Sequence, residues 1–268
     1  MTTVFLQTFS GFRAGLIAVS IGLFAVGLII VYTLEAFGGF EGMEQILEFV
    51  PESFRALLRA QGGFATSAQG FLAADYRHPI YLIGMSAFVI AAASGAVARE
   101  IERGSVLMLL AAPIARWKLL LSRMGALLAG VLVILAVSVL GTWTGIQLTG
   151  LSGEVDMTVF LRVQLNTLAL ALAIGGLTML LSARSSDGGQ TTGIAAGVFT
   201  VMYFLDFLAA LWSRAEPFGP LSLFYYYDPQ AISEFGGLPW RDLAVLFTVA
   251  VIGFGGALVV FQRRDIAR

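Results

Sequence analysis

The sequence predicts an all-α membrane protein with six transmembrane helices and both termini in the cytoplasm. Three observations support this fold class. Hydrophobic residues make up 58% of the 268 residues and charged residues only 12%, against about 45–50% and about 25% in soluble domains. The apolar residues fall in runs of about 20, the length of helix that crosses a bilayer. None of these runs alternates in the manner of a barrel strand.

Six apolar stretches of the sequence qualify as membrane spans. The loops between them are too short for a second domain, so residues 1–268 are expected to form a single transmembrane domain. The first stretch is too long for the apolar region of a signal peptide, and no small-residue cleavage site follows it. The expected spans are Ala14–Leu34, Ile80–Ala98, Met124–Trp143, Val163–Leu181, Thr191–Trp212 and Leu243–Phe261.

The distribution of Arg and Lys predicts the orientation of these spans, because cytoplasmic loops carry an excess of both residues. Six spans place both termini on the same side of the membrane. That side carries ten of the 16 Arg and Lys residues, and the other side carries six. We therefore expect cytoplasmic termini, an outer loop at Glu35–Pro79 and an inner loop at Arg99–Arg123.

The N-terminal segment Thr2–Arg13 precedes the first span and is expected to form a helix of its own. Its side chains Val4, Phe5, Phe9 and Phe12 fall near one helical face. A helix with one apolar face lies in the plane of the membrane interface. The alternative is that this segment is simply the frayed start of the first span.

The outer loop, residues 35–79, contains a second amphipathic stretch at Glu41–Arg59. Apolar residues recur there at helical spacing with charged residues between them. Pro51 would end one helix and begin another. We expect an outer helical cap that packs on the ends of the spans; the alternative is a gate over an exit path.

The cytoplasmic segment 99–118 is the most informative loop in the sequence. A charged start is followed by Gly104 and Ser105, and Ser105 can cap a new helix. The apolar run Val106–Ala112 is too short to cross the membrane, and Pro113 ends it. This pattern predicts a short helix on the cytoplasmic face that meets a soluble partner. The alternative is a re-entrant connector.

Motifs for nucleotide hydrolysis and for metal binding are missing from the sequence. The only lysine, Lys118, follows a tryptophan and is not part of a P-loop. There is no cysteine, and the one histidine, His78, is expected at the surface. We therefore predict no catalytic residue and no metal ligand. The formal net charge of −1 argues against a nucleic-acid partner.

Two features within the expected spans suggest specific roles. Asp206 lies in the fifth span, where a carboxylate is a candidate functional group. No intramembrane cation is visible beside it in the sequence, so it could face a transport path, lie near the headgroups, be protonated or be paired within the bundle. Gly189, Gly193 and Gly197 are four residues apart and predict close helix packing, within one chain or between two chains.

The cytoplasmic segment resembles the permease subunits of type-2 ATP-binding-cassette (ABC) exporters. The resemblance rests on Glu100-x-x-x-Gly104-Ser105, Leu109-Leu110 and Pro113-Ile114-x-Arg116. The aromatic segment Phe224–Pro229 and the tail Phe261–Ile266 are similar to elements near the end of the family's chains. Two features depart from the family pattern: Ala115 stands where the family often has Ser, and the outer loop is longer than in minimal permeases.

This resemblance implies a mechanism and a set of partners. A second permease chain, identical or homologous, would share the path, and two copies of a separate ATPase subunit would hold ATP and Mg²⁺. This chain would carry no cofactor. The family pairs its chains through the first and fifth spans, which agrees with the glycine spacing. The residues expected at the ATPase contact are Glu100, Glu102, Arg103, Gly104, Ser105, Pro113 and Arg116.

The leading functional hypothesis is therefore the permease subunit of an ABC exporter in a prokaryotic cell membrane, in contact with lipids. An ion-coupled secondary transporter is a second hypothesis; it would need ionisable groups at mid-membrane and an internal repeat. A non-transporting membrane scaffold is a third. A neighbouring gene for a P-loop ATPase would favour the first. The few charged residues in the spans fit a lipid or amphipathic substrate better than an ion.

Overall fold

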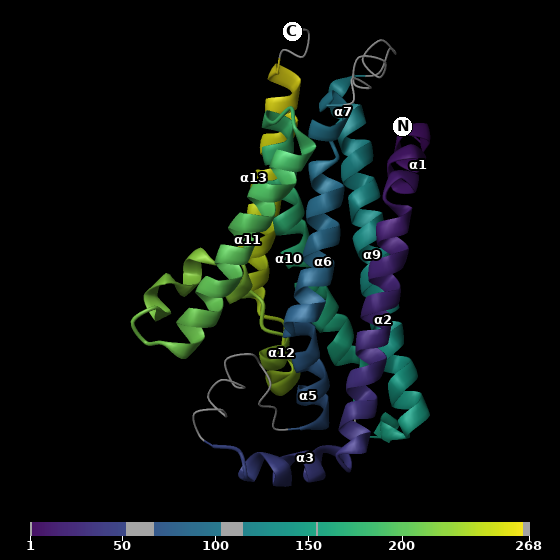
Figure 1. The fold of residues 1–268 in the computed structure, drawn as a ribbon, viewed down its shortest axis with the longest axis vertical. Helices are drawn as coiled ribbons and strands as arrows, with labels where there is room; N and C mark the ends of the chain where they lie inside the picture. The colour runs from purple at the N-terminus through teal and green to yellow at the C-terminus, as the bar shows by residue number, and fades with distance from the viewer. Residues whose placement is uncertain (1, 52–66, 103–114, 154, 265–268) are drawn as a thin grey trace.

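The computed structural model describes residues 2–51, 67–102, 115–153 and 155–264. Within these ranges the chain is helical and contains no strand, as the sequence predicts. Long helices run side by side, and both described ends of the chain lie toward the same end of the bundle (Figure 1). An even number of spans requires this arrangement. The cytoplasmic location of that end stays a prediction.

Five helices in the described part of the chain are long and apolar enough to cross a membrane. Each coincides with an expected span. Four of them extend beyond the predicted bounds at both ends. The helix at the fifth expected span, Thr191–Trp212, begins three residues before that span and ends one residue before its predicted end. The five are α2 (Arg13–Ala36), α9 (Arg116–Thr149), α10 (Met157–Arg184), α11 (Gly188–Leu211) and α13 (Trp240–Arg263).

The remaining expected span, Ile80–Ala98, corresponds to a shorter helix, α6 (Pro79–Ser94), of 16 residues. It ends early because a side chain of α10 stabilises a turn in the backbone. The Ser182 hydroxyl accepts the backbone N–H groups of Val97 (3.2 Å) and Ala98 (3.1 Å) and donates to the carbonyl of Ser94 (2.8 Å). The short helix α7 (Ala98–Glu102) then begins. The count of six spans therefore stays a prediction.

The long helices form two closely packed pairs, α2 with α9 and α10 with α13. Glycine makes this approach possible because it has no Cβ. A Cβ added at Gly141 of α9 would lie 2.3 Å from the carbonyl oxygen of Phe24. A Cβ added at Gly253 of α13 would lie 2.4 Å from the carbonyl carbon of Gly176. Backbone thus meets backbone in both pairs.

Helix α11 is much less buried than its neighbours, although α6 and α10 both contact it. It leans away from the other long helices in Figure 1. Only five of its 24 residues are buried in the chain, and most of its side chains face outward. The buried five are Gly188, Thr191, Ala195, Phe199 and Asp206.

The expected N-terminal helix is present as α1 (Thr2–Gly11), separate from α2. It packs on the bundle: Phe5 covers Gly125 of α9, and just after α1 the rings of Phe12 and Phe88 meet edge to face with centroids 5.4 Å apart. Its orientation in the plane of the interface stays a prediction.

Short helices gather at the end of the bundle opposite the chain termini. The first half of the expected outer cap is α3 (Gly39–Glu48), which crosses this end (Figure 1). Its second half lies outside the described residues. The other short elements at this end are α5 (Ala68–Ala74), η1 (Asp75–Arg77), η2 (Leu151–Gly153), η3 (Glu216–Leu221), η4 (Phe224–Tyr226) and α12 (Pro229–Phe235).

The glycine contacts predict a position-specific cost for adding a methyl group. Gly253→Ala should lower the free energy of unfolding by about 1–3 kcal/mol, because α13 and α10 must separate to admit the Cβ. Gly255→Ala, whose Cβ has no atom of the described chain within 4 Å, is the matched control; it should be neutral or stabilise the helix by up to about 1 kcal/mol. Unfolding in mixed micelles measures both, and equal effects would contradict the packing.

Candidate functional site

Two of the residues expected at the ATPase contact have described side-chain contacts at the end of the bundle that holds the chain termini. The Glu102 carboxylate accepts the backbone N–H of Gly188, the first residue of α11 (3.0 Å). Arg116, the first residue of α9, donates to the carbonyl of Arg264 (2.7 Å). Glu100 lies in α7. Residues 103–105 and Pro113 lie outside the described residues, so the short helix expected to meet the soluble partner stays a prediction.

A group of contacts near Glu102 joins the end of α6, α7 and the start of α11; because this end of the bundle is expected to face the cytoplasm, we call the group the cytoplasmic junction. Besides the Glu102–Gly188 hydrogen bond, the hydroxyls of Ser94 and Thr192 lie 2.8 Å apart. A Cβ at Gly188 would lie 2.2 Å from Cγ of Arg99, so the two helices touch directly. The negative charge of the Glu102 carboxylate is also stabilised by the positive end of the α11 helix dipole. Movement of α7 would therefore act on α11.

The tail of the chain makes a second connection at the same end. Arg264, just after α13, donates to the carbonyls of Ala183 (3.0 Å) and Ser185 (2.7 Å) and to the hydroxyl of Ser186 (2.9 Å). With the hydrogen bond from Arg116, these contacts join the start of α9, the turn between α10 and α11 and the end of α13. In the sequence, this tail is recognisable only through the resemblance to the family.

Asp206 forms an ion pair with a cation that the sequence did not reveal. The Arg77 guanidinium donates to the Asp206 carboxylate (2.8 Å) and to the carbonyl of Tyr227 (2.7 Å). Both side chains are largely buried, with 16% of Arg77 and 10% of Asp206 exposed. The pairing is possible because η1 directs Arg77 from the outer loop toward α11. This outer ion pair supports the alternative in which Asp206 is paired within the bundle.

A buried network of hydroxyl and amide groups adjoins the outer ion pair through Tyr227. The hydroxyl of Tyr76 meets that of Thr142 (2.9 Å), and the hydroxyl of Tyr227 donates to the carbonyl of Tyr76 (2.9 Å). Burial raises the pKa of Tyr76 and of Tyr227, so both phenols are neutral. Further members of the network are Tyr81, Ser138, Gln164 and Thr167. The network connects η1, α6, α9 and α10.

A second carboxyl group, which no sequence pattern indicated, lies near this network. Asp75 in η1 is buried, and desolvation raises its pKa from 3.8 to about 7. Its side chain can therefore bind or release a proton near neutral pH. The signal in the sequence is weak, because a carboxylate in an outer loop is usually solvated.

An apolar groove of about 440 Å³ runs between α6 and α11. One wall is aromatic, and the opposite wall is formed by Leu82, Ile83, Ala87 and Ile90 of α6. Such a groove suits an apolar or amphipathic molecule. Its outer end adjoins the outer ion pair, because Leu82 also borders the small cavity beside Arg77. The aromatic residues are Phe199, Tyr203, Phe204, Phe207 and Phe224.

The glycine stripe of α11 faces outward. Gly189, Gly193 and Gly197 are exposed, and a Cβ at Gly193 or Gly197 would meet no atom of the described chain within 4 Å. These positions therefore differ from Gly141 and Gly253, where backbones of one chain meet. The stripe is open to a second chain.

The one histidine lies where the sequence places it. His78 is exposed, and its Nδ1 accepts the backbone N–H of Ile80 (3.3 Å), which caps α6. Among the described residues, no three His, Cys, Asp or Glu side chains lie close enough together to hold a metal ion.

Comparison with families of known proteins gives a match over most of the chain. The family described as ABC-2 family transporter protein matches residues 13–266. The matched region contains the cytoplasmic junction, the outer ion pair, the groove and the glycine stripe. No curated protein and no solved structure matches the chain.

The outer ion pair predicts non-additive effects on stability. Asp206→Leu should lower the free energy of unfolding by about 1.5–3 kcal/mol, because it removes the charge-assisted hydrogen bond and leaves the Arg77 guanidinium only the Tyr227 carbonyl and the more distant Asp228 carboxylate (3.9 Å). Adding Arg77→Met should recover part of that loss, since the buried charge is then removed. A double-mutant cycle of unfolding free energies measures the coupling. Strictly additive losses would show that the two side chains do not interact.

Proposed function

Because the chain belongs to the ABC-2 family of transporter proteins and is thus a membrane subunit of an ABC transporter, we propose that it forms the translocation path of an exporter driven by a separate ATPase subunit. Two ATPase copies would hold the ATP and Mg²⁺. This chain would contribute the path and the surface on which each ATPase acts. Its location would be the cell membrane of a prokaryote.

The hydrogen bond between Glu102 and Gly188 carries this proposal. Glu102 ends α7, the described helix that leads into the expected ATPase contact, and Gly188 begins α11. A force applied by the ATPase to the segment after α7 would reach α11 through this contact. The tail provides a second connection, since Arg264 binds the turn that leads into α11.

Movement of α11 would change the groove between α6 and α11. One wall of the groove belongs to α11, which is loosely packed, and the other belongs to α6, which is largely buried among its neighbours. ATP-driven displacement of α11 would therefore open or narrow the groove. The apolar and aromatic lining supports a lipid or amphipathic substrate.

A second permease chain would complete the path. The exposed glycine stripe of α11 supports this proposal, because small residues let helices of two chains approach closely. Contact through this stripe would bring the grooves of two chains near each other. The partner chain would be identical or homologous.

An ion-coupled transporter has one observation in its favour, the buried Asp75 with a pKa of about 7. That carboxyl lies in η1 at the outer end. Asp206, the candidate for a path residue, forms an ion pair with Arg77. We therefore favour ATP as the energy source.

The cytoplasmic junction predicts a specific effect on coupling. Glu102→Ala removes the acceptor for the Gly188 N–H and should lower ATP-dependent transport about tenfold. This factor corresponds to the free energy of one charge-assisted hydrogen bond. Glu102→Gln keeps an acceptor oxygen and should retain most of the transport. Glu216→Ala, an exposed carboxylate at the outer end, is the control.

Transport in vesicles and co-purification of the ATPase are measured for all three variants, with candidate ABC ATPases from the same genome. We expect Glu102→Ala to co-purify normally while transport falls. Full transport by Glu102→Ala would refute the coupling role. Failure of every ATPase to bind the wild-type chain would refute the proposed function itself.

Pairing of two chains predicts cross-links along α11. The chain has no cysteine, so a single Gly193→Cys variant reports only on this position. Oxidation should give a disulfide-linked dimer in membranes, whereas Val251→Cys, on the 70% exposed Val251 of α13, should give little. Cross-linking at Val251 but not at Gly193 would place the contact elsewhere.

A further inference from the structure

The turn between α6 and α7 is held by one side chain of α10. Ser182 is fully buried, and its hydroxyl makes the three hydrogen bonds described above to the backbone of Ser94, Val97 and Ala98. A serine hydroxyl can donate one hydrogen bond and accept two, so these contacts use its full capacity. Because a buried backbone group without a partner costs free energy, the turn depends on this hydroxyl.

Helix α10 gives the contact a firm base. It has the largest number of buried residues of the five long helices, 17 of its 28. Its Gly176 packs directly on the backbone of α13. Its end is held as well, because Arg264 donates to the carbonyls of Ala183 and Ser185. Ser182 therefore belongs to the densely packed part of the bundle.

Helix α7 is connected to α10 at its start and to α11 at its end. Ala98, the first residue of α7, donates to Ser182, and Glu102, the last, accepts the N–H of Gly188. The two ends are four residues apart, about 6 Å along the helix axis. A helix this short and attached at both ends passes a movement on instead of bending. Helix α7 is thus arranged as a lever between the bundle and α11.

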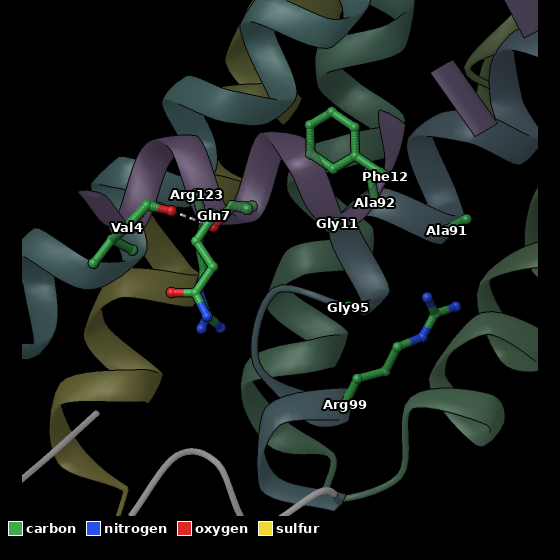
Figure 2. Close-up of a pocket in the computed structure, with 10 residues that line it drawn as sticks. Val4, Gln7, Gly11, Phe12, Ala91, Ala92, Gly95, Arg99 and Arg123 are labelled. Carbon is green, nitrogen blue, oxygen red and sulfur yellow. Dashed lines mark hydrogen bonds between the residues drawn. The ribbon is translucent and has the colours of Figure 1, made fainter. Parts of the chain in front are cut away.

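A pocket beside the turn leaves room for this lever to tilt. Its volume is about 150 Å³, and it lies between α1 and the end of α6 (Figure 2). Gln7 of α1 borders it on one side, and Gly95 in the turn and Arg99 in α7 border it on the other. A helix that borders a pocket can shift with less displacement of packed side chains than one enclosed in a close-packed core.

We propose that Ser182 is a positioning residue, the pivot about which α7 turns when the ATPase acts on the segment that follows α7. The proposal rests on the proposed function, because it assigns Ser182 a part in force transfer through the cytoplasmic junction. The hydroxyl hydrogen can rotate about the Cβ–Oγ bond, so the contact persists while α7 tilts. The start of α7 stays on α10, and the movement of its end passes to Gly188. Without the hydroxyl, the turn would separate from α10 and absorb the movement.

Hydrogen exchange in the purified chain tests the contact without any ATPase. The amides of Val97 and Ala98 should be protected in the wild type, and Ser182→Ala should speed their exchange about three- to tenfold, which corresponds to one neutral hydrogen bond. Thr178→Val is the matched control, because Thr178 lies one turn earlier in α10, is also buried, and donates to the carbonyl of Ile174 in its own helix (2.8 Å). Unprotected amides in the wild type, or equal exchange in both variants, would overturn the pivot.

A distance measurement by electron paramagnetic resonance then tests the pivot in the complex with the ATPase. Spin labels are placed at Val201 of α11 and Val251 of α13, both exposed. ATP should shift their distance fully in the wild type and in Thr178→Val, and by less than half as much in Ser182→Ala. A full shift in Ser182→Ala, with or without a changed distance before ATP is added, would overturn the pivot alone. Absence of a shift in the wild type would overturn the proposed function as well.

Discussion

The position of α11 depends on polar contacts at its two ends. In a bilayer the apolar side chains of a helix gain nothing by leaving lipid for protein, so polar contacts and close packing decide where the helix lies. The first residue of α11 donates to Glu102, and near its other end Asp206 binds Arg77. Between these contacts most of the helix faces outward. Two attachments with little packing between them allow α11 to move without unfolding.

The rest of the bundle is built in the opposite way. The pairs α2–α9 and α10–α13 meet backbone to backbone through glycine, and the tyrosine network joins α6 to α9 and α10 near the outer end. Dense packing and the hydrogen bonds of the tyrosine network make this part rigid. The groove lies where the rigid part meets α11, with one wall on each. A membrane subunit of an ABC transporter needs both properties, since a force must move one element against another.

Hydropathy predicted the long helices well because length and apolarity decide whether a segment crosses a bilayer. The end of α6 was harder to predict, since the turn after Ser94 depends on Ser182, which is 88 residues away in the sequence. The cation beside Asp206 was missed for the same reason: Arg77 reaches it from an outer loop. The glycine spacing predicted close packing but not its partner, because a stripe within one chain and a stripe between chains have the same sequence pattern.

The central claim is that α11 moves against a rigid bundle, and a distance measurement by electron paramagnetic resonance tests it most directly. Spin labels at Val201 of α11 and Val251 of α13, both exposed, report on α11. Labels at Leu161 of α10 and Val251 report on the bundle. In complexes of ATPase with labelled chain diluted by unlabelled chain, ATP should shift the Val201–Val251 distance and leave the Leu161–Val251 distance unchanged. An unchanged Val201–Val251 distance, or an equal shift in both, would contradict the account.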